Sequence, residues 1–76
     1  MSCISLREET LEALRAQCNG NIKKARMNVE IYLHNPVGIG EHSDILSAIQ
    51  DQIDLIAKEK ERLEVIETHF TNHNHE

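Results

Sequence analysis

Two runs of apolar residues at helical spacing, separated by one stretch rich in proline and glycine, constrain the fold of this chain most strongly. Across residues 11–33 and again across 45–70, apolar residues recur every three or four positions, which is typical of one face of an α-helix. The stretch 35–42 between them contains residues that disfavour or interrupt helical geometry. The sequence therefore predicts an all-α fold, an antiparallel hairpin of two long helices. The predicted hinge residues are Asn35, Pro36, Gly38 and Gly40.

Capping residues set the predicted boundaries. Ser5 and Glu8 fit a capping box, in which each side chain bonds a free backbone amide of the first turn, so the first helix is expected over about 5–34. Ser43 or Asp44 is expected to cap the second helix, which then covers about 43–69. A single domain over 5–70 results, with an extension at 1–4 and a disordered tail at 71–76. The segment Asn19-Gly20-Asn21 is ordinarily a turn signal, but the apolar phase continues across it; we favour one helix and keep a break as the alternative.

Each helix carries one main apolar stripe that the hairpin is expected to bury. The stripes are Leu11, Leu14, Cys18, Ile22, Ala25, Val29 and Leu33 in the first helix, and Ile45, Leu46, Ile49, Ile53, Ile56, Leu63 and Phe70 in the second. If the helix ends are level, Lys23 and Arg26 lie beside Asp54 and Asp51 and form ion pairs across the helices.

A second set of apolar residues lies away from these stripes. In the first helix, small residues among them would let another backbone approach closely, and one partner helix cannot cover both sides. Soluble monomers rarely expose such patches, so the sequence predicts a two-fold dimer of hairpins forming a four-helix bundle, or a groove for another helical protein. The interface candidates are Ala13, Ala16, Gly20, Met27, Ile31, Leu55 and Ile66.

Composition excludes several classes of function. A net charge of −5 argues against a general nucleic-acid binder, although the cluster Lys23-Lys24-Arg26 leaves a small nucleic-acid-associated regulator as an alternative. The chain has no apolar stretch that predicts a secretion signal or a membrane span, and its two cysteines form no metal or redox motif. These features predict a cytoplasmic protein without a membrane contact.

The hinge holds the best-placed group of polar side chains. Glu30 and His34 share one helical face, and Glu41 and His42 lie across the hinge, so these four are candidate metal ligands. The simpler interpretation is that His34 and Glu41 complement the charges of the helix ends. No catalytic set and no cofactor motif can be placed together, which predicts a protein that is not an enzyme and needs no cofactor.

The segment Asn35-Pro36-Val37-Gly38-Ile39-Gly40-Glu41-His42, followed by Asp44-Ile45, carries a resemblance. It resembles a group of small proteins of marine tailed phages and marine metagenomes that share an NPVGIGEHxDI signature, over about residues 25–70. The resemblance implies a phage or environmental origin, and hence the host cytoplasm, and it transfers no activity. The predicted function is a non-enzymatic, homo-oligomeric interaction or assembly module; the alternatives are a metal-binding bundle and a nucleic-acid-associated regulator.

Overall fold

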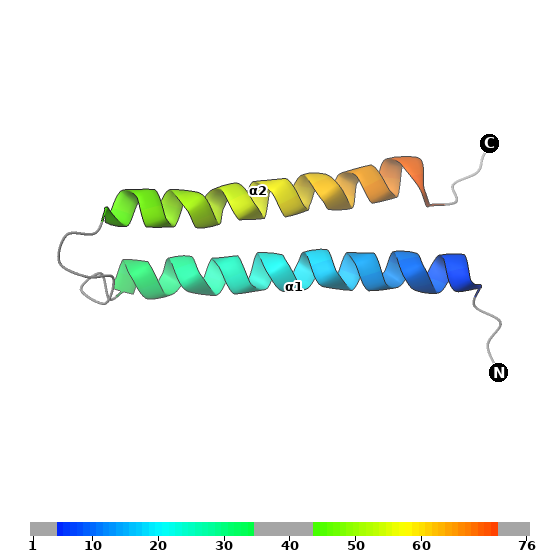
Figure 1. The fold of residues 1–76 in the computed structure, drawn as a ribbon, viewed down its shortest axis with the longest axis horizontal. Coiled ribbons are helices and arrows are strands. Elements are labelled where there is room, and N and C mark those ends of the chain that lie inside the picture. Colours follow the sequence, from blue (N-terminus) through cyan, green and yellow to red (C-terminus); the bar gives the residue numbers. More distant parts are fainter. Residues whose placement is uncertain (1–4, 35–43, 72–76) are drawn as a thin grey trace.

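The computed structural model describes residues 5–34 and 44–71 of the chain and shows two helices packed as an antiparallel hairpin (Figure 1). Helix α1 spans Leu6–His34 and helix α2 spans Ile45–His69. The predicted fold class and both helices are confirmed. The predictions for the extension at 1–4, for the hinge and for most of the tail concern 1–4, 35–43 and 72–76, which lie outside the described residues.

Side-chain caps explain where the helices begin. The Ser5 hydroxyl accepts a hydrogen bond from the Glu8 backbone amide at 3.1 Å, as one half of the predicted capping box requires. Of the two candidate caps for α2, Asp44 is the one that acts: its carboxylate accepts a hydrogen bond from the Ser47 amide at 3.1 Å. At the other end of α2, the amides of Phe70 and Thr71 both donate to the Ile66 carbonyl oxygen.

Helix α1 continues without a break through Asn19-Gly20-Asn21, as the unbroken apolar phase predicted. A Cβ atom built on Gly20 would meet nothing within 4 Å, so no close contact within the hairpin requires a glycine there.

The contact between the helices follows a seven-residue repeat that includes polar residues. Apart from Asn28 and Ala48, the buried and half-buried residues on each helix are spaced alternately by three and four, which is the pattern of an antiparallel coiled coil. We call this contact the seam. It consists of Leu11, Arg15, Cys18, Ile22, Ala25, Val29 and Tyr32 from α1, and of Ile45, Ile49, Gln52, Ile56, Glu59, Leu63 and Ile66 from α2.

The seam corrects the predicted stripes. Leu33, Leu46 and Ile53 were expected to be buried between the helices, but they are 58%, 77% and 51% exposed. Leu14 and Phe70, which belong to the same predicted stripes, are also exposed. Conversely, Ile66 was expected on an outward face, but it is only 7% exposed because it packs in the seam. The stripes were drawn through apolar residues alone, whereas the seam passes through Gln52 and Glu59, and this rotates α2 about its axis relative to the prediction.

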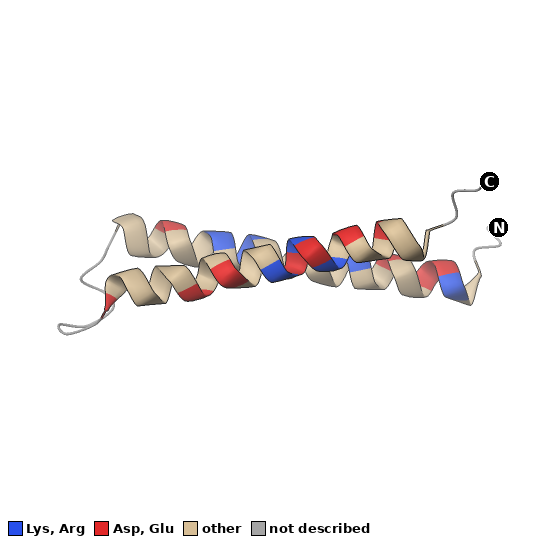
Figure 2. Cartoon of the chain, turned by 90° about the horizontal axis from the view of Figure 1, so that it is seen from above, with Lys and Arg blue, Asp and Glu red and all other residues tan. Residues whose placement is uncertain are grey.

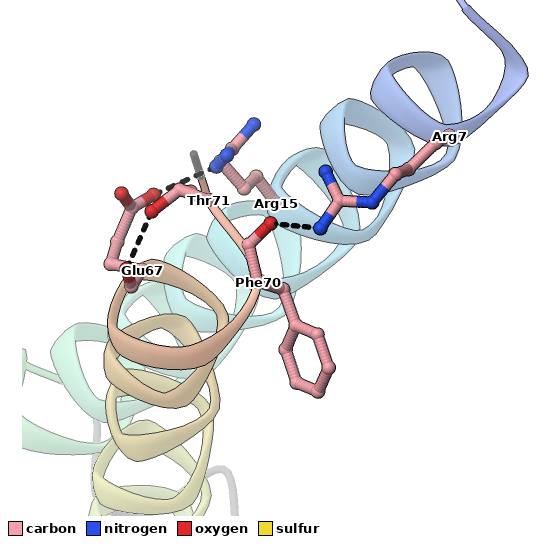
Figure 3. Close-up of polar contacts among 5 residues, drawn as sticks. All are labelled: Arg7, Arg15, Glu67, Phe70 and Thr71. Atoms are coloured by element: carbon pink, nitrogen blue, oxygen red, sulfur yellow. Dashed lines mark hydrogen bonds and ion pairs between the residues drawn. The ribbon is translucent and has the colours of Figure 1, made fainter. Parts of the chain in front are cut away.

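Contacts across the seam define the register. Asn21 bonds Glu59, Asn28 bonds Gln52, and near the open end of the hairpin Arg7 donates to the Phe70 carbonyl oxygen at 2.5 Å (Figure 3). With the Arg15–Glu67 ion pair included, paired residue numbers add up to about 77 to 82, close to the level ends that the sequence predicted.

The predicted ion pairs between Lys23 or Arg26 and Asp54 or Asp51 are absent from the described residues. An ion pair does cross the seam nearer the open end of the hairpin, where Arg15 Nε lies 2.8 Å from Glu67 Oε2 (Figure 3). Figure 2 shows basic residues around the middle of the hairpin and again at the start of α1, with acidic residues along the whole length of the hairpin. The prediction failed because Lys23 and Arg26 lie beside the seam, where long side chains remain in solvent.

Candidate interaction surfaces and a buried polar cluster

The hairpin is one helix thick, so it has two broad faces, one on each side of the seam. Residues that directly precede a seam residue lie on one side, and four of them line a single groove of about 440 Å³: Asn21, Lys24, Asn28 and Leu55. We call this side the amide face, after its asparagines and the neighbouring Gln52. Ala25 and Gln52 complete the lining of the groove.

The opposite side carries apolar residues in the half nearer the hinge. Leu33, Leu46 and Ile53 each directly follow a seam residue, which places them on the side opposite to Asn21 and Asn28. We call this side the apolar face. By the observed register Leu33 and Leu46 lie opposite each other across the seam, and Ile53 lies two turns further along α2. These three exposed aliphatic side chains form the apolar surface of this side of the hairpin.

The same side of α2 is hollowed in the half nearer the open end. A shallow hollow of about 590 Å³ has Ala57 and Leu63 among its lining residues, and its other lining residues are charged. Lys60 and Glu67 follow Ile53 at intervals of seven residues, so the hollow lies on the apolar face. The charged residues that line it are Lys60, Glu61, Glu64 and Glu67.

The interface candidates on α1 are all exposed. Ala13, Gly20 and Met27 repeat every seven residues on the edge of the hairpin that points away from α2, with Ala16 and Ile31 beside them. We call this surface the outer edge of α1. Of the two candidates on α2, Leu55 is exposed but lies on the amide face, and Ile66 is buried in the seam. The structure therefore does not bring the seven candidates together on one surface.

The candidate metal ligands are only partly described. His34 Nδ1 lies 2.8 Å from the Glu30 carbonyl oxygen and 3.5 Å from Glu30 Oε1, whereas Glu41 and His42 lie outside the described residues. Both Glu30 and His34 are exposed. Within residues 5–34 and 44–71, no three His, Cys, Asp or Glu side chains come together as a metal site would require.

A buried polar cluster lies in the middle of the seam, and sequence reasoning missed it. Glu59 is only 3% exposed, and its Oε2 accepts hydrogen bonds from Asn21 Nδ2 at 3.2 Å and from Arg62 at 3.0 Å. Glu59 Oε1 is buried and accepts no hydrogen bond of ordinary geometry in the structure. The buried, free thiol of Cys18 adjoins this carboxylate. A search of the sequence for a seven-residue repeat that allows polar residues at the contact positions could have identified Glu59.

The cluster shifts the pKa values of its members in opposite directions. Burial raises the pKa of the Cys18 thiol, and the adjacent Glu59 carboxylate raises it further. For Glu59, burial opposes ionisation, but hydrogen bonding from Cys18 and Asn21 together with the charge of Arg62 outweighs it, so the pKa of Glu59 is lowered. The carboxylate is therefore ionised and the thiol protonated at neutral pH, which makes Cys18 a poor nucleophile.

Comparison with models of known protein families, with curated proteins and with solved structures finds no match to this chain. Neither described helix has a stretch that is both long enough and apolar enough to cross a membrane. The interpretation of function therefore depends on the surfaces and the polar cluster described above.

Proposed function

We propose that this chain is a non-catalytic helical interaction module that self-associates, two hairpins packing into a four-helix bundle. The observation that carries the proposal is the amount of surface that a single chain leaves exposed. The chain has 5932 Å² of accessible surface, whereas a compact monomer of 8.7 kDa is expected to expose about 4,700 Å².

This excess, about 1,200 Å², is of the size that a subunit buries in a stable dimer, since standard interfaces remove about 800 Å² from each partner. The shape leads to the same conclusion. The described residues form a hairpin that is one helix thick (Figure 1). A second hairpin would supply the mass that makes the assembly compact.

The seam itself also supports a second layer. Ile22, Val29, Ile49, Ile56 and Leu63 are only half-buried, because two helices cover each other along one line and leave both sides of that line open. Stable domains bury such residues between two packed layers. Two hairpins stacked face to face would form these layers as a four-helix bundle.

Sedimentation equilibrium at several protein concentrations, with and without a chelator, tests the proposal. We expect a dimer mass that the chelator does not change. A monomer at every concentration would overturn the proposal, and a dimer that the chelator dissociates would replace it with the metal-binding alternative at Glu30, His34, Glu41 and His42.

The other expectations from sequence remain predictions. These are the phage origin, the cytoplasmic location, the absence of catalysis and of a cofactor, and the low affinity for nucleic acid. Binding of another helical protein to the same surface would appear as a stable monomer that forms a mixed complex.

A further inference from the structure

We propose that the second copy docks on the apolar face, in the opposite direction, so that Leu46 of each hairpin enters the hollow of the other. This inference rests on the proposed self-association and names the surface and the arrangement that produce it. It differs from the sequence prediction, which placed the interface mainly on the outer edge of α1.

The first step of the argument is that the apolar face is complementary to itself. Leu46, the most protruding residue on this face at 77% exposed, lies on one side of Ile53, and the hollow at Ala57 and Leu63 lies on the other. A two-fold axis close to Ile53 exchanges these two halves. A single two-fold rotation therefore places Leu46 of each copy in the hollow of the other, as a closed two-fold interface requires.

The second step concerns what the alternative surfaces would bury. Contact through the outer edge of α1 would join helices edge to edge and leave the half-buried seam uncovered on both sides. Contact through the amide face would place the groove residues Asn21, Asn28 and Lys24 against a partner, which requires new hydrogen bonds for each. Docking on the apolar face covers the seam and desolvates the aliphatic side chains of Leu33, Leu46 and Ile53, and it also brings the charged residues of the hollow against the partner.

Two residues give a matched pair of variants. Ile53 on the apolar face is 51% exposed and Met27 on the outer edge of α1 is 54% exposed, so both are large apolar residues with similar burial in the single hairpin. We expect Ile53→Asp to weaken the dimer by about tenfold or more in sedimentation equilibrium, and Met27→Asp to leave it unchanged. The opposite result would overturn the apolar face as the interface.

Cross-linking tests the arrangement without a buried charge. In a Cys3→Ser/Cys18→Ala background that keeps the parent mass and helicity, Ile53→Cys lies near the proposed two-fold axis and is expected to form a disulfide between copies under mild oxidation. Met27→Cys is the control and should stay reduced at the same concentration. If Met27→Cys cross-links and Ile53→Cys does not, the interface is the outer edge of α1.

The outcomes separate the two proposals. A parent dimer with the variant pattern reversed overturns the docking surface and leaves self-association standing. A parent monomer overturns both. If Ile53→Asp also loses its helical circular dichroism, the Ile53→Cys and Met27→Cys variants determine which surface forms the interface. These variants introduce no charge into the apolar face.

Discussion

Glu59 is an ionised carboxylate enclosed in the centre of an otherwise mainly apolar contact. Removing such a group from water is costly; its Oε2 regains hydrogen bonds from Asn21 and Arg62, and the Cys18 thiol also interacts with the carboxylate. Buried polar residues in coiled coils are best known for fixing register. Glu59 fits that role here, because its bond to Asn21 is satisfied in only one alignment of the two helices.

The lowered pKa of Glu59 predicts acid sensitivity. Because its pKa is lower in the hairpin than in the unfolded chain, the unfolded chain binds more protons in the acidic range. The contribution of Glu59 to stability is therefore complete above the unfolded pKa, about 4.3, and is lost as pH falls through the lower folded value. Between about pH 6 and pH 3, Glu59→Gln should lose less free energy of unfolding than the parent, as urea denaturation measures.

The matched control is Asp54→Asn, since Asp54 is an exposed carboxylate on the same helix that lies outside the seam and outside the hollow. The free energy of unfolding of this control variant should change with pH as that of the parent does. Equal pH dependence in the parent and both variants would show that Glu59 does not contribute.

At the scale of the element, both helices begin at a capping residue, and α1 has a glycine in its middle. Ser5 and Asp44 hold the first turns of α1 and α2 through their side-chain oxygens. Gly20 lies in the middle of α1, exposed and without a neighbour that a Cβ would touch. Its cost is therefore the ordinary entropic cost of glycine in a helix.

Replacing Gly20 with alanine should stabilise the hairpin. We expect Gly20→Ala to raise the free energy of unfolding by about 1 kcal/mol, because alanine restricts the unfolded backbone and fits the helix without contact. Thermal denaturation followed by circular dichroism measures the change. Ala16→Gly, on the same exposed surface, should lower stability by a similar amount; a loss of stability in Gly20→Ala would contradict the open environment.

Removing the cap of α2 should have the reverse effect. Asp44→Ala eliminates the hydrogen bond to the Ser47 amide and should cost about 1 kcal/mol in chemical denaturation. Asp54→Ala removes an exposed aspartate from the middle of the same helix and should change stability much less. Equal losses would mean that net charge, and not the cap, is responsible.

The sequence was sufficient to predict the elements and insufficient to predict which side of each helix is buried. Capping residues and the proline after His34 are local signals, so the helix bounds agree with the structure within about two residues. The burial of Gln52 and Glu59 depends on partners on the other helix, and no local pattern encodes those. Ile66 and Leu46 were consequently exchanged between the buried and exposed sets.

At the scale of the whole molecule, the hairpin is a layer that measures 15 Å in its thinnest direction. A layer this thin cannot enclose a core, and the described residues buried in it are Cys18, Ala25, Glu59 and Ile66. Its stability should therefore be coupled to association.

This coupling predicts a melting temperature that depends on concentration. When folding and association are linked, mass action stabilises the folded state as chain concentration rises. We expect the melting temperature of the parent to increase over a hundredfold range of concentration, about 0.01 to 1 mM, and that of Ile53→Asp to stay constant. A parent melting temperature that does not change with concentration would contradict the coupling.

The bond between Arg7 and the Phe70 carbonyl places the start of α1 and the end of α2 side by side (Figure 3). A force that pulls these two ends apart would act across the seam and not along it. The helices would then separate from the open end one contact at a time, as a zipper opens. The Arg15–Glu67 ion pair would be among the first contacts to break, and the Glu59 cluster would be reached only near the middle. A tether attached at this end would therefore open the hairpin gradually at low force.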